Sequence, residues 1–288
     1  MEQNINGPHF SSWEDAVQWL RNQPDRQDLV RAAYYDDPLS EAVERYYRSE
    51  EWAEISAMLP ASRGWSLDVG AGRGIASYAL AREGFKVTAL EPDESKLVGA
   101  NAIRAMAEES GVDIEVIEDF SEKLPFEDHQ FDVVFARAVL HHTRDLEAAC
   151  AEFFRVLKPG GKFIAVREHV ISRDEDLDAF LEIHPLHKLY GGENAFRLAQ
   201  YESAITKSGF HLERISSPLE SAVNYFPHTL RGLQREIAIK ASRNLPVVRT
   251  ILEHLLRIPF MWSLALPLLT RLDKRPGRLY SFVAIRPA

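Results

Sequence analysis

Three glycines and an aspartate that lie close together in the sequence could bind a ligand. Gly70, Gly72 and Gly74 follow the short run 67–69, which contains Asp68. This spacing predicts a buried strand, a tight turn and then a helix, because glycine allows tight turns and lets a ligand approach the backbone. The free N–H groups of the first helical turn would face that ligand. A turn without a ligand is the alternative. The predicted cofactor contacts are Asp68, Gly70, Ala71 and Gly72.

A second acid follows the next apolar run. Residues 87–90 end at Glu91, which is 17 positions past Gly74 and is followed by Pro92. A carboxylate at the carboxyl end of a second strand can accept hydrogen bonds from both hydroxyls of a ribose. Glu91 and Pro92 are therefore predicted cofactor contacts. A solvated acid at a strand end is the alternative for Glu91.

A third group comprises an acid and an aromatic residue after another apolar run. Asp119 and Phe120 follow residues 114–117. The carboxylate could accept a hydrogen bond from an adenine amino group, and the phenyl ring could pack on the adenine ring. The alternative places Phe120 in the core and gives Asp119 a role in capping a turn.

A parallel sheet would bring these residues together, and the remaining pattern predicts one. The first 60 residues carry apolar side chains at helical spacing, and from Trp65 short apolar runs alternate with helical stretches. The predicted class is α/β, a Rossmann-like seven-stranded sheet with helical cap insertions. The expected strands are residues 66–69, 86–90, 114–117, 132–136, 161–167, 211–216 and 279–286.

The length and composition fit one catalytic domain with additions. A chain of 288 residues, 45% of them hydrophobic and 27% charged, can bury a full core. We expect an N-terminal helical cap over residues 1–60. The catalytic domain would then cover residues 61–288, with insertions at about 169–208 and 217–278.

Cysteine usage and the first residues bear on the compartment. Cys150 is the single cysteine, so no intrachain disulfide can form, as is usual in a reducing compartment. The first residues lack the positive start and apolar core of a secretory signal. A cytoplasmic location is expected, with a membrane-peripheral location as the alternative.

One segment differs from the rest in charge. Between Thr229 and Arg278, ten Lys or Arg residues stand against three acids, a net charge of +7 in a chain whose total is −9. Its arginine-flanked apolar faces predict either a cap packed on the sheet or an element that binds a membrane surface or a phosphate-bearing amphiphile. Its apolar run 258–269 is shorter than the roughly 20 residues that span a bilayer. Because the rest of the chain is acidic, a nucleic acid acceptor is not expected.

Four motifs in this order resemble the class I S-adenosylmethionine-dependent methyltransferases, particularly the small-molecule branch with LPFxDxxFD. They are LDVGAGRG from residue 67, LEPD from residue 90, IEDFSEKLPFEDHQFDVVFARAVLHH from residue 117 and LKPGGKF from residue 157. The resemblance covers about residues 64–168. It implies S-adenosylmethionine as the cofactor, a small-molecule acceptor and an antiparallel last strand.

The resemblance also assigns parts of the cofactor to particular residues. The glycine turn would line the methionine part, Glu91 would bind the ribose, and Asp119 with Phe120 would bind adenine. Ala136 and Arg137, which leave the fourth predicted strand, would face the methionine carboxylate or the methyl group.

Two adjacent histidines are candidates for acid–base chemistry. Methyl transfer from a sulfonium is an in-line displacement, so positioning supplies much of the rate and a base is optional. A base helps when the acceptor is a hydroxyl or a protonated amine, and we expect O- or N-methylation. His141 and His142 follow the fourth predicted strand. His141 is the preferred base, and a packing role remains open for His142.

The ten histidines of the chain do not predict a metal site. His184 and His187 lie three positions apart, but Pro185 between them prevents a regular helical pairing, and no nearby cysteine completes a tetrahedral set. No metal is therefore expected. The loop that carries Tyr190 and Glu193 would be either a lid over the substrate or an ordinary surface connection.

Two other functions remain open. A nucleotide-dependent oxidoreductase would use a similar domain, but its fingerprint has a third glycine three positions past the second, where this chain has Ile75. A protein that kept the cofactor-binding fold without catalysis, and serves as an adaptor, is the second alternative.

Overall fold

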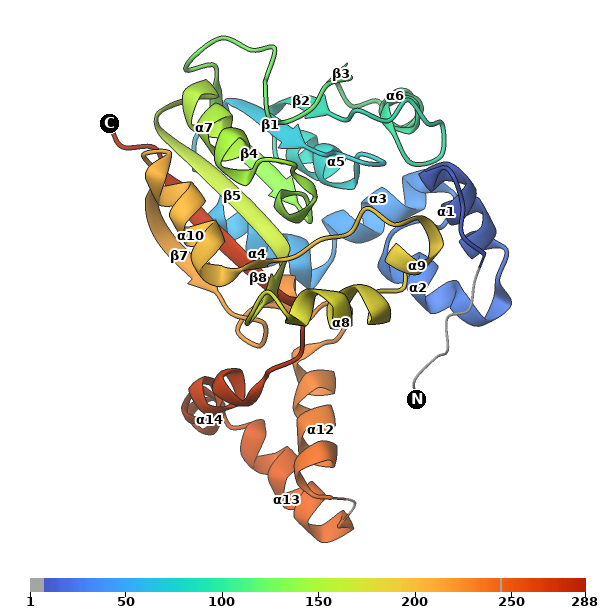
Figure 1. The fold of residues 1–288 in the computed structure, drawn as a ribbon, viewed down its shortest axis with the longest axis vertical. Coiled ribbons are helices and arrows are strands. Elements are labelled where there is room, and N and C mark those ends of the chain that lie inside the picture. Colours follow the sequence, from blue (N-terminus) through green and yellow to red (C-terminus); the bar gives the residue numbers. More distant parts are fainter. Residues whose placement is uncertain (1–7, 244) are drawn as a thin grey trace.

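The computed structural model describes residues 8–243 and 245–288, and an eight-stranded sheet runs through the centre of this part of the chain (Figure 1). Its order is β3-β2-β1-β4-β5-β8-β7, and β6 pairs with β5. β8 is antiparallel to β5 and β7, and the other pairs are parallel. The strands are β1 (Trp65–Val69), β2 (Lys86–Leu90), β3 (Ile114–Ile117), β4 (Phe131–Arg137), β5 (Leu157–Ile171), β6 (Phe196–Arg197), β7 (His211–Ser216) and β8 (Arg278–Ile285).

The α/β class and the antiparallel last strand are confirmed, whereas the number of seven strands was wrong by one. The additional strand, β6, has two residues, which is too short for an alternating pattern to show in the sequence. β5 is also longer than predicted, because it continues to Ile171 past an irregularity between Ala165 and Glu168. His169 therefore lies inside β5 and not after it.

Helices cover both faces of the sheet. The helices are α1 (Trp13–Arg21), α2 (Gln27–Ala32), α3 (Leu39–Tyr47), α4 (Glu50–Met58), α5 (Ile75–Arg82), α6 (Ala100–Ser110), α7 (Leu146–Val156), α8 (Asp176–Ile183), α9 (His187–Tyr190), α10 (Leu198–Lys207), α11 (Ala222–Tyr225), α12 (Leu230–Ala241), α13 (Pro246–Leu256) and α14 (Pro259–Leu272), with the 3-10 turns η1 (Pro24–Arg26) and η2 (Leu140–His142). Side chains of α7 and α10 share one core cluster with the sheet. Side chains of α3, α4, α5 and α11 share another with it.

The central strands are buried on both faces, which explains their nearly continuous apolar sequences. Leu67 in β1 and Val134 in β4 are fully buried on one face, and Phe135 in β4 and Ile164 in β5 are fully buried on the other. Each such side chain contributes about 1.5–3 kcal/mol when it leaves water. Because β1, β2 and β4 are parallel neighbours, their carboxyl ends lie at one edge of the sheet. The glycine turn, Glu91 and Arg137 are thereby brought to that edge.

Additions surround this sheet at two places. The helices expected in the first 60 residues are α1 to α4. α1 and α2 lie beside the carboxyl edge of the sheet (Figure 1), whereas α3 and α4 contribute to the core on one of its faces. Helices α12 to α14, residues 230–272, extend away from the sheet, and we refer to them as the C-terminal projection (Figure 1). The predicted domain boundaries stay predictions. In the predicted insertion at about 169–208, α10 packs on α7 and leads into β7, so it belongs with the sheet. The inserted part is therefore mainly α8, α9 and β6.

Candidate active site

The glycine turn after β1 contains open space at one of its three glycines. Gly70, Gly72 and Gly74 have φ angles of +60°, +55° and +80°. A Cβ atom on Gly70 would lie 2.8 Å from Val139, and one on Gly74 would lie 2.9 Å from Met106. A Cβ atom on Gly72 would meet nothing nearer than a backbone oxygen 4.0 Å away. Two glycines are therefore needed for packing, while Gly72 borders a hollow that a ligand can enter.

Glu91 lies against this turn and not in solvent. It follows β2 and is 8% exposed. Its Oε2 accepts a hydrogen bond from the Gly72 N–H at 2.7 Å, and its Oε1 accepts one from the Asp93 N–H at 3.0 Å. Burial raises the pKa of Glu91, and the two backbone hydrogen bonds oppose that shift. Each carboxylate oxygen keeps a further lone pair, so both can still accept hydrogen bonds from a ligand.

Asp68 is the buried acid at the end of β1. Its Oδ2 accepts a hydrogen bond from the Ser77 hydroxyl at 2.5 Å, which joins β1 to α5 across the turn. Burial raises the pKa of Asp68 to about 7, assisted by the charge of Glu91 and opposed by the hydrogen bond from Ser77. Ala71, between Asp68 and Gly72, donates its N–H to the Leu90 carbonyl at 3.1 Å and so holds the turn against β2.

The predicted adenine contacts lie on the exposed side of the same edge. Asp119 is half-buried, and its Oδ1 accepts the N–H of Phe120 at 2.8 Å. Phe120 is 56% exposed, with the Arg144 guanidinium 5.4 Å from its ring centre. Pro92 is exposed beside Glu91. Phe120 is therefore not a core residue, but its role and that of Asp119 stay predictions.

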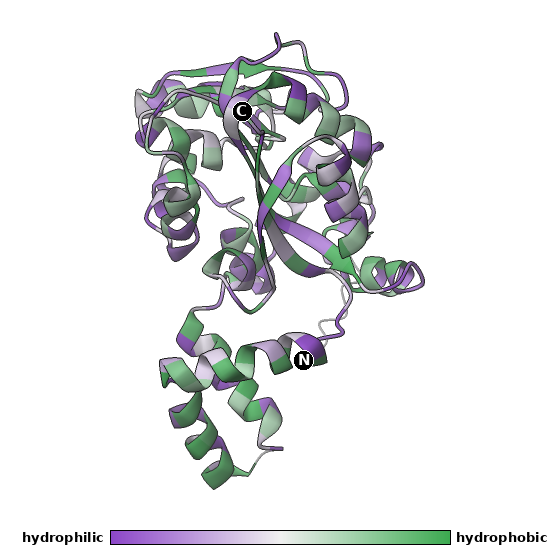
Figure 2. Ribbon diagram, turned by 90° about the vertical axis from the view of Figure 1, so that its left-hand side faces the viewer, coloured by the Kyte–Doolittle hydropathy of each residue, from purple (hydrophilic) through white to green (hydrophobic). Residues whose placement is uncertain are grey.

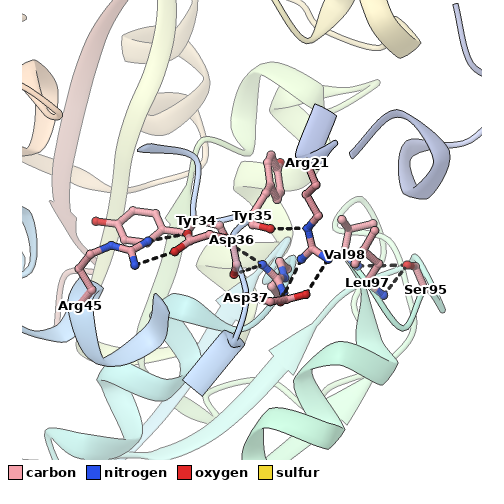
Figure 3. A network of polar contacts seen from close by, with 10 residues as sticks. Arg21, Tyr34, Tyr35, Asp36, Asp37, Arg45, Ser95, Leu97 and Val98 are labelled. Carbon is pink, nitrogen blue, oxygen red and sulfur yellow. Dashed lines mark hydrogen bonds and ion pairs between the residues drawn. The ribbon is translucent and has the colours of Figure 1, made fainter. Parts of the chain in front are cut away.

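The N-terminal helices are fastened to the glycine turn by a residue of the turn itself. Arg73 is buried and donates to the carbonyls of Tyr34 and Asp36 at 2.9 and 3.0 Å, and it pairs with Asp37 at 2.5 Å. Arg21 also pairs with Asp37, at 2.8 Å. Figure 3 shows this network around residues 34–37. The acidic segment between α2 and α3 thus closes one side of the site.

Arg137, at the end of β4, has its partner in the N-terminal helices. Its guanidinium forms two hydrogen bonds to the fully buried Glu51, at 2.7 and 3.2 Å, and lies over the rings of Tyr34 and Tyr46. Sequence reasoning missed Glu51, because it lies 86 positions from Arg137. Ala136, before it, is fully buried. Contact of Ala136 or Arg137 with the cofactor stays a prediction, and the structure gives the guanidinium a second function in holding the cap.

The two candidate histidines lie side by side but in different environments. His141 is buried, and its Nδ1 lies 2.7 Å from Oε2 of Glu168. Burial lowers the pKa of His141, but the hydrogen bond to Glu168 and the charges of Glu168 and Glu193 outweigh it and raise the pKa to about 9. The side chain of His142 is 42% exposed, and its Nδ1 lies 3.0 Å from the Gly192 carbonyl. Partial burial and the nearby His141 lower the pKa of His142.

The expected loop is only partly a loop, because Tyr190 ends the helix α9 and Glu193 follows in the loop after it. The Phe10 N–H donates to the Leu189 carbonyl at 2.7 Å, and the Trp13 and Tyr190 rings pack 5.8 Å apart. α9 is therefore held against the N-terminal segment, and Oε2 of Glu193 lies 3.6 Å from Nε2 of His141. Whether this loop acts as a lid stays a prediction.

Comparison with known proteins places this site in a family. A family model described as a methyltransferase domain matches residues 67–165. The ubiquinone/menaquinone biosynthesis C-methyltransferase of Brucella anthropi is 31% identical over 191 residues, which cover 60% of this chain and 71% of that protein. The sarcosine/dimethylglycine N-methyltransferase of Halorhodospira halochloris is 35% identical over 143 residues, covering 48% of this chain and 49% of that protein.

Solved structures share the fold at lower sequence identity. Geranyl diphosphate C-methyltransferase from Streptomyces coelicolor A3(2) gives a TM-score of 0.58 at 14% identity, covering 98% of this chain and 91% of that chain. The [4+2]-cyclase SpnF gives the same TM-score of 0.58 at 17% identity, covering 98% of both chains. At such identities the likeness concerns the fold alone.

The chain belongs to the class I S-adenosylmethionine-dependent methyltransferases. It is thus an enzyme that uses S-adenosylmethionine, and the open space at Gly72 with the inward-facing Glu91 fits that cofactor. This assignment sets aside both the oxidoreductase and the silent adaptor. Membership of the branch marked by LPFxDxxFD stays a prediction.

Proposed function

We propose that this enzyme methylates an oxygen or nitrogen atom of an amphiphilic, phosphate-bearing or lipid-linked small molecule, by direct in-line transfer at a membrane surface. The observation that carries the proposal is a cavity of about 750 Å³ at the root of the C-terminal projection. It lies between the N-terminal helices and the segment that leads into α12. It has apolar walls from Tyr34 and Phe226, and its charged lining comprises three arginines and three acids, Arg31, Arg45, Arg48, Asp28, Glu50 and Glu51. Arg45 and Arg48 pair with Asp36 and Glu44, so an anionic group of a molecule with an apolar body would meet Arg31.

The cofactor would be held at the carboxyl edge of the sheet. We assign the methionine part to Asp68, Gly70, Ala71 and Gly72, with Ala136 and Arg137 beside it. We assign the ribose to Glu91 and Pro92, and adenine to Asp119 and Phe120. When bound, S-adenosylmethionine supplies an electrophilic methyl group on a sulfonium. Glu51, which pairs with Arg137, lines the cavity, so in this assignment the acceptor and cofactor spaces would adjoin.

In place of His141, the base preferred from the sequence, we propose that His142 accepts the acceptor's proton, because His141 is buried and its pKa is raised to about 9. Neither histidine lines the cavity, so the reacting atom of the acceptor would extend from the cavity to His142. His142 is the more exposed of the two candidates, and its Nδ1 contact with the Gly192 carbonyl fixes the direction of its ring. His141, buried behind it with ring centres 4.2 Å apart, would position it. A His142→Gln variant should lose about 10²-fold or more in kcat while its affinity for S-adenosylmethionine is unchanged.

The C-terminal projection supports the choice of a membrane surface. Its helices α13 and α14, whose residues are all described, contain no buried residue. Figure 2 shows that most of their residues are hydrophobic. Exposed apolar side chains on them are Val247, Val248, Ile251, Leu255, Phe260, Met261, Leu264, Leu268 and Leu272. Within the described residues no single helix is long and apolar enough to cross a membrane, although α13 and α14, bent by 106° where they meet, satisfy that test as a pair. An apolar surface with nearby arginines binds anionic lipid headgroups.

The relatives support a small-molecule acceptor without fixing the atom. One relative is named for C-methylation in ubiquinone/menaquinone biosynthesis and another for N-methylation of sarcosine and dimethylglycine. The acceptor test is transfer of labelled methyl from S-adenosylmethionine into an extract that is separated into lipid and aqueous fractions. We expect a labelled product in the lipid fraction, absent with a Glu91→Ala variant, and attached through oxygen or nitrogen. Label only in water-soluble metabolites, or on carbon, would contradict the proposal.

Vesicle flotation tests the membrane surface separately. The chain should float with anionic vesicles and much less with neutral ones. An Ile251→Glu/Leu264→Glu variant should lose flotation, because both side chains are exposed on the projection. A matched control is Glu213→Gln on β7, which should float as the unaltered chain does. Equal flotation of the double variant, or none of the unaltered chain, would refute membrane contact.

A further inference from the structure

A buried group of imidazoles and a carboxylate gathers where the loop after α9 meets the sheet. His141 comes from η2, His169 from β5 and Glu193 from the loop. One ligand atom from each of the three, a ring nitrogen or a carboxylate oxygen, lies within 4.8 Å of the other two. His184, at the end of α8, is adjacent, with its Nδ1 3.7 Å from Oε1 of Glu193. Four separate segments thus converge on one point.

The two central histidines are oriented by outer partners. Nδ1 of His141 lies 2.7 Å from Glu168, and Nδ1 of His169 lies 3.0 Å from the Gly277 carbonyl. Because Nδ1 is engaged in both residues, Nε2 is the ring nitrogen that could bind a metal ion. Metal-binding histidines nearly always donate their second ring N–H to a carboxylate or a backbone carbonyl, which fixes the tautomer and the ring orientation. The arrangement around His141 and His169 is of this kind.

Glu193 has a buried oxygen that no hydrogen bond accounts for. Its Oε2 is buried and has no hydrogen-bond partner among the described residues. That oxygen lies 3.6 Å from Nε2 of His141 and 3.8 Å from Nε2 of His142. These distances are too long for hydrogen bonds, but two ligands of one ion bound at about 2.0–2.2 Å stand roughly 3.3–3.6 Å apart. Burying a carboxylate oxygen without a hydrogen bond is costly. A proton on His141 or a cation between these atoms would offset that cost, and a bound metal ion would displace the proton.

We propose that His141, His169 and Glu193 bind a divalent transition-metal ion, with His184 beside it. Two imidazoles and one carboxylate suit Zn²⁺ or Fe²⁺ and leave a coordination position open. Glu168 and Glu193 place two negative charges next to the histidines, and a divalent cation neutralises them. The site goes beyond the proposed methyl transfer and does not depend on the identity of the acceptor.

The inference reverses the expectation from the sequence that no metal is bound. That expectation rested on local spacing around Pro185, and α8 does end at Ile183, before that proline. The three ligands, however, are spread over residues 141–193 and are assembled by β5 and the loop. Local spacing in the sequence therefore did not reveal them.

The test is metal binding by the full chain, freed of any affinity tag and of bound metal. Calorimetric titration with Zn²⁺ should give one equivalent bound with a dissociation constant of about 1 μM or lower. Titration with Co²⁺ should give visible absorption bands of a site with nitrogen and oxygen ligands. The absence of both signals would overturn the proposal.

Variants locate the site. Glu193→Gln and His169→Gln, in different segments, should each weaken Zn²⁺ binding at least 100-fold, and Glu168→Gln should weaken it about 10–100-fold through the orientation of His141. His211→Gln, an exposed histidine at the start of β7, is the matched control and should bind Zn²⁺ unchanged. Circular dichroism and S-adenosylmethionine affinity verify that each variant is folded. Zn²⁺ binding that is unaltered in folded Glu193→Gln and His169→Gln would place the ion elsewhere and refute the assignment.

Discussion

At the scale of single residues, the three glycines of the turn differ in what their missing side chains allow. Gly70 and Gly74 leave room for Val139 and Met106, so they serve packing within the protein. Gly72 faces open space and contacts Glu91 through its N–H. The sequence predicted the turn and its ligand, but the distinct tasks of the glycines depend on neighbours that are distant in the chain.

A valine at Gly72 should remove cofactor binding and leave the fold intact. The side chain would enter the hollow, and the φ of +55° adds a strain of about 1–2 kcal/mol. We expect at least a 10-fold loss of S-adenosylmethionine affinity by calorimetry, with cooperative unfolding retained. Gly74→Val is the matched variant and should instead unfold at a markedly lower temperature. Unchanged affinity in folded Gly72→Val would contradict the site.

Asp68 should make stability depend on pH in an unusual direction. Because burial raises the pKa of Asp68 to about 7 from 3.8, the folded chain holds the proton more strongly than the unfolded chain does. Its contribution to stability is complete below the unfolded pKa and is lost as pH rises towards the folded one. Relative to Asp68→Asn, the unaltered chain should lose about 3 kcal/mol of unfolding free energy between about pH 4.5 and about pH 7.5. Parallel pH profiles of urea unfolding for the two proteins would refute this.

At the scale of elements, the strands that carry the site were predictable and the contacts between distant elements were not. β1, β2, β3 and β7 lie within one residue of their expected bounds. β1 and β2 are buried, continuous apolar runs bounded by turns, whereas β3 and β7 are partly exposed strands at the two edges of the sheet. The extension of β5 was missed, since its added part at the carboxyl end begins with the polar residues Glu168 and His169. The contact of Glu51 with Arg137 was missed because only the folded chain brings α4 to the end of β4.

That pair should couple the N-terminal helices to the sheet. Glu51→Gln leaves the guanidinium of Arg137 without its carboxylate in a buried place, which costs about 3–5 kcal/mol. Urea unfolding would measure the loss. Lys207→Met is the matched control, because its partner Glu147 and Lys207 itself are both largely exposed, and its effect should be far smaller. Equal effects of the two substitutions would contradict a structural role for the Glu51–Arg137 pair.

At the scale of the whole molecule, charge and apolar surface are separated. The acidic sheet domain contains the proposed cofactor residues, and the projection, which is basic in sequence and largely hydrophobic (Figure 2), extends from it. The sequence predicted this separation through its charge count. It left open whether the apolar faces pack on the sheet. The exposed side chains of α13 and α14 show that these two helices do not pack on it.

The projection should therefore exchange its amide protons much faster than the sheet. Helices without buried side chains open locally at low cost, whereas β1, β4 and β5 open only with the whole domain. Hydrogen exchange by mass spectrometry should show low protection in residues 246–272 that rises with anionic vesicles and not with neutral ones. Protection equal to that of the sheet without vesicles would mean that another surface already covers the projection.

The central claim is that the hollow beside Gly72 binds the nucleoside of S-adenosylmethionine and that Glu91 holds its sugar. A crystal structure with S-adenosylhomocysteine tests this most directly. The account predicts that both ribose hydroxyls lie within about 2.6–3.2 Å of the Glu91 carboxylate oxygens. A nucleoside bound elsewhere, or a Glu91 side chain turned away from the sugar, would contradict it.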